Sequence, residues 1–73
     1  METVFISSEY ITLGQFLKYN GLISNGSEAK IAVLTFKITI NGESETRRGR
    51  KIYPGDLIKI NKKSYLVAQK NDN

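Results

Sequence analysis

The residues best suited to binding chemistry lie in one basic run. Three arginines and a lysine surround Gly49 there, namely Arg47, Arg48, Arg50 and Lys51. A guanidinium group binds phosphate oxygens in a bidentate geometry, and a glycine lets a loop follow a curved surface. We therefore expect this run to form an exposed, mobile loop whose cations contact phosphates.

The net charge of the chain comes from the same region. The 73 residues contain 11 Lys and Arg against 7 Asp and Glu, which gives a net charge of +4. From Arg47 to Lys63 there are seven bases and one acid, whereas residues 1–46 are net negative. Clustered cations suit a polyanion, because binding releases the counterions condensed on it. On charge alone, a solvated rim that keeps a small domain in solution is an equally good interpretation.

A second candidate site precedes an apolar helical stripe. Ser24 can cap a helix there, and such a helix would present free N–H groups and a positive dipole end to an anion. The small residues Asn25, Gly26 and Ser27 would then cradle a phosphate, and Lys30, one turn further on, would reach the same anion.

Catalytic chemistry has little support in this composition. The chain contains no Cys and no His, which excludes disulfides, thiol nucleophiles, Ser-His-Asp triads and zinc fingers. Glu43 and Glu45 are two residues apart, and we interpret them as partners of nearby arginines that keep the basic loop from collapsing onto the preceding hairpin. We expect no enzymatic activity, no cofactor and no metal.

Two helices are predicted to position these residues. The first follows a short strand over residues 3–7, starts after Thr12 as N-cap and ends at Asn20-Gly21. The second carries apolar residues at helical spacing from Ala29 to Phe36. Ile31 and Leu34 lie on its flank, so we expect this helix to be covered on more than one side.

The remaining elements are predicted to be strands. Residues 37–40 alternate and lead into Asn41-Gly42, a strong hairpin signal, followed by a weak or edge strand over 43–47. The turn Tyr53-Pro54-Gly55-Asp56 precedes strands over 57–60 and 65–68. The order predicts one α+β domain over residues 1–69 and a polar tail over 70–73.

Aromatic residues are divided between core and surface. We expect Phe5, Phe16 and Phe36 in the core. Buried tyrosine rings are commoner than base-stacking ones, so of Tyr10, Tyr19, Tyr53 and Tyr65 we single out only Tyr53, which follows the basic run, for stacking.

This order of elements resembles the S4 RNA-binding domain family. The motifs that carry the resemblance are Ser27-Glu28-Ala29-Lys30, Ile38-Thr39-Ile40-Asn41-Gly42-Glu43 and Gly55-Asp56-Leu57-Ile58. The runs at 11–18 and 45–51 are similar to the stand-alone YaaA-type subfamily of short bacterial S4 proteins. The resemblance implies an S4-like fold (the αL motif), in which two short helices pack on a small, mainly antiparallel sheet.

The chain departs from the family at the starts of both helices and at the end of the second, where Thr35-Phe36-Lys37 replaces the Gly or acidic residue of many members. The widespread S4 domain has an Arg near the start of the first helix and Thr-Arg-Ser opening the second. This chain has Leu13-Gly14-Gln15 and Asn25-Gly26-Ser27 there, so phosphate contacts by those arginines do not carry over.

The sequence therefore predicts a non-catalytic protein that binds structured RNA through a basic surface. The resemblance implies ribosomal RNA or ribosomal particles as partners, in ribosome assembly, with the protein a monomer. Two alternatives stay open. The first is a protein-interaction or β-grasp-like carrier module; a carrier needs a C-terminal Gly-Gly, whereas this sequence ends in Lys70-Asn71-Asp72-Asn73. A DNA-binding protein would use the same charge but needs a recognition helix.

The location is predicted to be the cytoplasm, away from membranes. The N-terminus has an acid where a signal peptide needs bases, and the longest apolar run, Ile31 to Leu34, is four residues.

Overall fold

The main layer of the molecule is a five-stranded sheet. The computed structural model describes residues 1–71, so the last two residues of the predicted tail lie outside the described part. The strand order is β1-β7-β6-β3-β4, in which β1 and β7 are parallel and the other pairs antiparallel. The strands are β1 (Glu2–Ile6), β3 (Ile38–Ile40), β4 (Glu43–Ser44), β6 (Leu57–Ile60) and β7 (Lys63–Gln69).

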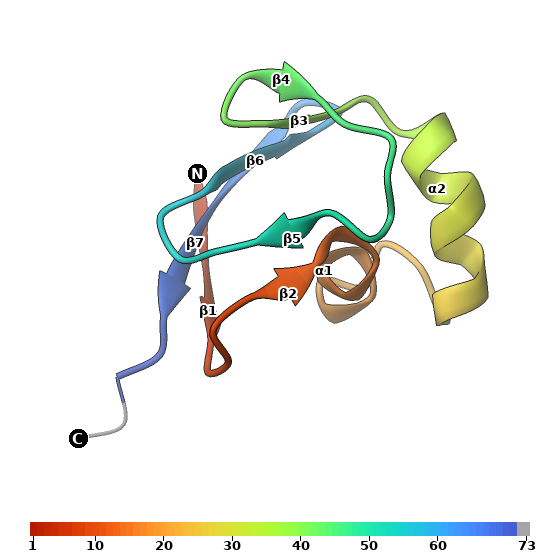
Figure 1. Cartoon of the computed structure of the whole chain (residues 1–73). Coiled ribbons are helices and arrows are strands. Elements are labelled where there is room, and N and C mark those ends of the chain that lie inside the picture. Colours follow the sequence, from red (N-terminus) through yellow and green to blue (C-terminus); the bar gives the residue numbers. More distant parts are fainter. Residues whose placement is uncertain (72–73) are drawn as a thin grey trace.

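A second, two-stranded sheet lies beside the first helix (Figure 1). It pairs β2 (Ile11–Thr12) with β5 (Lys51–Ile52) in antiparallel register, Ile11 opposite Ile52 and Thr12 opposite Lys51. This pairing was not predicted, because each strand has only two residues and the two strands are distant in the chain.

The first helix, α1 (Leu13–Tyr19), begins as predicted. Gln15 N–H donates to the Thr12 hydroxyl at 3.2 Å, and Thr12 N–H donates to Gln15 Oε1 at 2.8 Å. This reciprocal capping box satisfies two N–H groups that a helix start leaves without partners. The helix ends at Asn20, and Gly21 follows with φ +73°, a conformation that glycine adopts without strain.

The second helix starts later than predicted. A 3₁₀ turn, η1 (Gly26–Glu28), precedes α2 (Ala29–Thr35). The cap of this turn is Asn25, whose side-chain oxygen accepts from the N–H groups of Ser27 and Glu28 at 3.0 and 3.3 Å. The prediction of Ser24 as the cap is therefore wrong, because Asn25 occupies the position from which a side chain reaches these donors.

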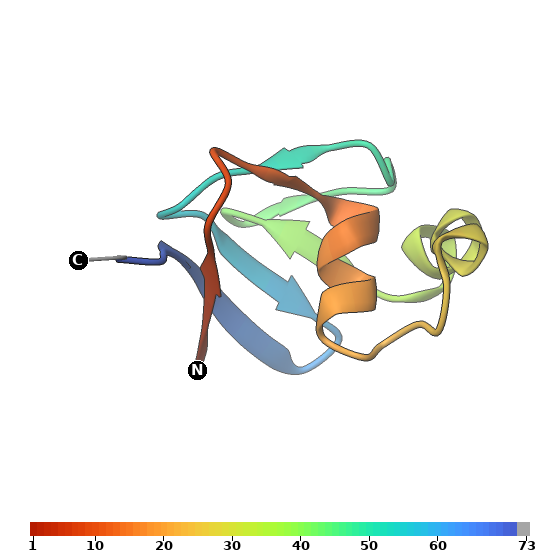
Figure 2. The same ribbon diagram turned by 90° about the horizontal axis from the view of Figure 1, so that it is seen from below.

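The buried side chains of the main sheet, the two-stranded sheet and the helices form one core. Figure 2 shows α1 beside the main sheet. Strand alternation turns Ile38, Ile40, Ile58 and Ile60 inward, each at most 3% exposed. The largest fully buried side chains are Phe16, Leu13, Leu17, Ile40, Ile52, Ile58 and Val67.

The outer side of α2 is not covered by the described residues. Ile31 and Leu34 are 69% and 72% exposed, so the predicted covering of this flank is wrong. The reason is the position of α2 at one end of the molecule, where it packs against α1 through Ala29, Ala32 and Val33 (Figure 1). Phe5 was also expected in the core but is exposed.

Both predicted tight turns are present. Asn41 and Gly42 have φ values of +52° and +87°, as a type I′ hairpin requires. Gly55 has φ +96°, and Asp56 N–H donates to the Tyr53 carbonyl at 3.0 Å, which closes the turn around Pro54.

Among the helices of residues 1–71, none has the length and apolarity needed to cross a bilayer.

Candidate nucleic-acid interface

The predicted basic loop is docked on the start of α1. Leu13 N–H donates to the Arg50 carbonyl at 2.8 Å, and Gly14 N–H donates to the Arg48 carbonyl at 2.9 Å. The first N–H groups of a helix need acceptors from outside the helix, and the loop backbone supplies them. The expectation of a mobile loop is therefore wrong: hydrogen bonds to α1 and the β2–β5 pairing fix its path.

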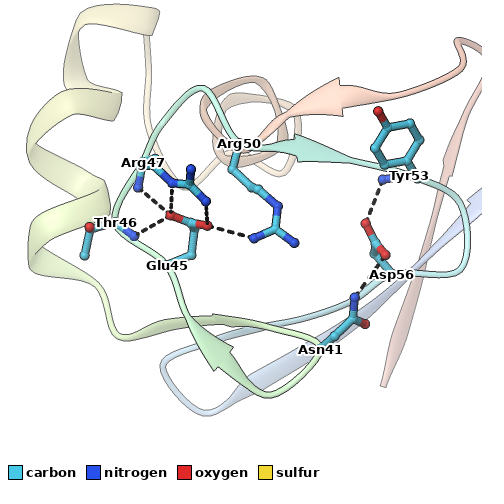
Figure 3. Close-up of polar contacts among 7 residues, drawn as sticks. All are labelled: Asn41, Glu45, Thr46, Arg47, Arg50, Tyr53 and Asp56. Carbon is cyan, nitrogen blue, oxygen red and sulfur yellow. Dashed lines mark hydrogen bonds and ion pairs between the residues drawn. The ribbon is translucent and has the colours of Figure 1, made fainter.

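A buried carboxylate organises the same segment (Figure 3). Glu45 is 6% exposed. Its Oε2 accepts from Thr46 N–H at 3.1 Å, from Arg47 N–H at 3.0 Å and from Arg47 Nε at 2.9 Å. Its Oε1 accepts from Arg47 Nη2 at 3.0 Å and from Arg50 Nη1 at 2.8 Å. These donors give a buried charge the partners that make its burial tolerable.

The Arg47 side chain holds the pKa of Glu45 well below its usual range, against the opposing effect of burial, with further help from the Arg47 N–H and from Arg50. Glu45 in turn raises the pKa of Arg47. The prediction of Glu45 as an arginine partner is correct. It was expected to keep the loop away from the hairpin, but it instead binds Arg47 and Arg50 of the loop to a residue that directly follows β4. Glu43 is exposed on β4.

The four cations of the basic run therefore fall into two pairs. Arg47 and Arg50 both bind Glu45, with side chains 72% and 35% exposed. Arg48 and Lys51 are exposed. Arg48 lines a groove beside α1, whereas Lys51 lies with its Nζ 4.9 Å from the centre of the Tyr10 ring.

The groove is lined by residues of the loop, of α1 and of the start of the second helix. It has a volume of about 340 Å³. Its lining residues come from α1, from the start of α2 and from the loop: Thr12, Gly14, Gln15, Lys18, Gly26, Ala29, Arg48 and Gly49. A Cβ at Gly14 would lie 3.2 Å from the Cβ of Ala29, so glycine allows the two helices their close approach here.

This groove brings together two predicted sites that are far apart in the chain. Gly26 comes from the turn before α2, and Arg48 comes from the basic loop. Lys18 is a further cation in the lining that was not predicted to be functional. The sequence could have indicated Lys18 by its position. It lies in the last turn of α1, directly after the buried residues Phe16 and Leu17. Lys30 and Lys51 are exposed but lie outside the lining.

The turn before α2 does not offer the free N–H groups that were expected. Asn25 Oδ1 accepts from Ser27 N–H and Glu28 N–H, and the Ser27 hydroxyl also donates to it at 2.5 Å. The backbone cradle predicted for a phosphate is therefore already occupied by a side chain. At Gly26 a Cβ would meet open space, so a Cβ can be added there without a clash.

In the described part of the chain, no group of three His, Cys, Asp or Glu side chains could hold a metal ion.

The fold is that of an S4 domain. The model of the S4 domain family matches residues 4–68, and the chain belongs to this family. A relative from Bacillus subtilis (strain 168), described as a probable ribosome maturation protein RlbA, is 44% identical over 57 residues. These residues are 78% of this chain and 80% of the relative. The predicted family and the predicted α+β fold, with helices packed on a mainly antiparallel sheet, are confirmed.

Proposed function

We propose that this protein is a non-catalytic RNA-binding protein that acts in ribosome maturation. The observation that carries the proposal is the groove, which places Arg48 and Lys18 on opposite elements around the small residues Gly26 and Gly49. Membership of the S4 domain family and the description of the Bacillus relative support the same role.

Side chains, rather than backbone N–H groups, bind the phosphates of the RNA. The N–H groups of Ser27, Glu28, Thr46 and Arg47 already donate to Asn25 or Glu45, so the backbone is poorly placed to bind an anion. Arg48 and Lys18 bind phosphates in the groove. Of the other predicted residues, Gly26 lines the groove, and Asn25 and Ser27 belong to the same turn. Arg47 and Arg50 hold the loop through Glu45, whereas Lys30 and Lys51 lie outside the lining.

The RNA is a folded one, recognised by shape. Double-stranded RNA is bound mostly through phosphates and 2′-hydroxyls across its wide, shallow minor groove. We propose structured ribosomal RNA, free or in ribosomal particles, as the target, bound by a monomer in the cytoplasm.

The test compares RNA with DNA across a salt series. A hairpin RNA and a DNA duplex of the same sequence are titrated with wild type and with the double variant Lys18→Ala and Arg48→Ala. If each side chain neutralises one phosphate, the slope of log K against log salt should fall in magnitude by about 2 in the double variant. Wild type should prefer the RNA.

A matched control uses two other exposed lysines. Lys59 and Lys62 lie around a different hollow, formed by β3, β6 and the β6–β7 turn. Their double alanine variant removes the same charge and should keep the wild-type affinity and slope. A larger loss in the control would place RNA binding on the sheet side and contradict the groove. Equal binding of RNA and DNA would favour the DNA-binding alternative.

A further inference from the structure

The outer face of the β2–β5 ribbon carries an aromatic pair beside a cation. In this antiparallel register Ile11 lies opposite Ile52 and Thr12 opposite Lys51, so the next residues outward, Tyr10 and Tyr53, lie opposite each other. Ile52 is fully buried. Because successive side chains of a strand point to opposite faces, Lys51 and Tyr53 share the outer face.

Tyr10 contacts both Tyr53 and Lys51. The ring centres of Tyr10 and Tyr53 are 5.6 Å apart, with the rings tilted by 46°. The Nζ of Lys51 lies 4.9 Å from the centre of the Tyr10 ring. Tyr53 is 41% exposed. Because the two rings are tilted by 46°, they do not cover each other face to face.

The position of Tyr53 is fixed by the turn that follows it (Figure 3). Tyr53 N–H donates to Asp56 Oδ2 at 2.8 Å, and Asn41 Nδ2 donates to Asp56 Oδ1 at 3.0 Å. Asn41 Oδ1 accepts from Leu57 N–H at 3.0 Å. The backbone of Tyr53 is therefore clamped to the β3–β4 hairpin, so the aromatic surface exists before any ligand binds.

This surface continues into the proposed RNA groove. A hollow next to the ribbon is lined by Ser8, Glu9, Tyr10, Ile11, Thr12 and Gln15. Thr12 and Gln15 also line the groove that holds Arg48. The carboxylate of Glu9 makes the hollow a poor place for a phosphate and a suitable one for the exocyclic amino group of a base.

We propose that the outer face of the β2–β5 ribbon binds one unpaired nucleobase of the RNA. The base stacks on Tyr53 and Tyr10, the phosphate next to it binds Lys51, and the adjoining double-stranded part occupies the groove. Aromatic side chains stack on unpaired bases whatever their sequence. This inference rests on the proposed function and adds a class of target to it: an RNA helix interrupted by an unpaired nucleotide.

The experiment uses two hairpin RNAs that differ in one bulged adenosine. A third RNA carries 2-aminopurine at the bulge, because its fluorescence is quenched when it stacks. Wild type should bind the bulged RNA about tenfold more tightly than the unbulged one and should quench the probe. Tyr53→Leu should lose the preference and the quenching while it keeps the affinity for the unbulged RNA.

Two further variants control for the fold and for tyrosine loss in general. Tyr53→Phe keeps the ring and should keep the preference. Tyr19→Leu removes a tyrosine that is 67% exposed at the end of α1 and should behave as wild type. Equal affinity of wild type for the two hairpins, or a preference that survives in Tyr53→Leu, would overturn the stacking site and leave the groove intact. Failure of wild type to bind either hairpin would instead overturn the proposed function.

Discussion

The turn before α2 and the segment after β4 use the same local device. In each, one side chain accepts from successive backbone N–H groups just after it. Asn25 accepts from Ser27 and Glu28, and Glu45 accepts from Thr46 and Arg47. The turn at residues 25–27 and the basic run at residues 47–51 were both predicted to contact phosphate, but N–H groups in each already have an acceptor within the chain.

The two acceptors differ in charge and burial. Asn25 is neutral and exposed, whereas Glu45 is charged, buried and bound to two arginines. Asn25 therefore stabilises one turn, while Glu45 fixes a segment that also caps α1 through the carbonyls of Arg48 and Arg50. A basic run is thus divided by its neighbouring acid into cations that hold the fold and cations that stay available for a ligand.

The largest expected effect is the loss of the Glu45 carboxylate. Glu45→Ala leaves the N–H groups of Thr46 and Arg47 without their acceptor and should lower the free energy of unfolding by about 2–3 kcal/mol. The loss is limited because the side chains of Arg47 and Arg50 remain accessible to water. A domain of this size has only about 4–11 kcal/mol in total, so the melting temperature should fall steeply. Glu43→Ala removes an exposed carboxylate two residues away and should change stability by less than about 0.5 kcal/mol. Equal effects of the two substitutions would contradict the structural role of Glu45.

The same carboxylate predicts a loss of stability in acid. Its pKa is well below the usual range in the folded protein and is about 4.3 in the unfolded chain. Between these values the unfolded chain binds more protons. The stabilisation is therefore complete above about pH 4.3 and is lost as the pH falls towards the folded-state pKa. Urea unfolding at pH 7 and pH 3 should show a smaller acid loss in Glu45→Gln than in wild type; identical losses would show that other acids are responsible.

A smaller effect on stability should distinguish the arginines that bind Glu45 from the cations that do not. Arg50→Ala removes a 2.8 Å ion pair to buried Glu45 and should cost about 1–2 kcal/mol, since the partly exposed side chain gives less than a fully buried one. Arg48→Ala should change stability by less than about 0.5 kcal/mol and should weaken RNA binding. Thermal unfolding and RNA titration on both variants test this division. The reverse pattern, a stable Arg50→Ala and an unstable Arg48→Ala, would contradict it.

What the sequence predicted correctly depends on interactions between near neighbours. The Asn41-Gly42 hairpin, the Thr12 cap and the Gly55 turn each require a few adjacent residues with particular backbone preferences. The alternation of Leu57 to Ile60 likewise identifies a strand with one buried face. Such signals are present in any short window of the chain, so the elements and their order are accessible without the fold.

What it missed depends on residues that meet only in the folded chain. Nothing near Glu45 in the sequence indicates that it is buried. Its arginine partners reach it only because the loop that carries them is held against α1. The period of α2 marks Ile31 and Leu34 as apolar but does not say which side of the helix has a neighbour. The groove joins Gly26 to Arg48, and the ribbon joins Tyr10 to Tyr53, across long stretches of chain.

The smallest expected effect on stability comes from Gly26, and it tests the groove directly. A side chain there meets open space, so Gly26→Glu and Gly26→Lys should both fold with stabilities within about 0.5 kcal/mol of wild type. In the first turn an acid is slightly favoured by the helix dipole and a base slightly disfavoured. Thermal unfolding should therefore rank Gly26→Glu at or just above Gly26→Lys.

RNA binding should rank the same two variants in the opposite order. The carboxylate of Gly26→Glu enters the groove that Arg48 and Lys18 line, where it competes with a phosphate for their charge, and affinity should fall by about tenfold, the equivalent of about 1.4 kcal/mol. Gly26→Lys adds a cation of similar length at the same point and should bind at least as well as wild type. Because the two side chains are alike in bulk, the difference between them measures charge in the groove alone. If both variants bind RNA like wild type, the phosphates do not enter this groove, and RNA binding must be assigned to another face of the molecule.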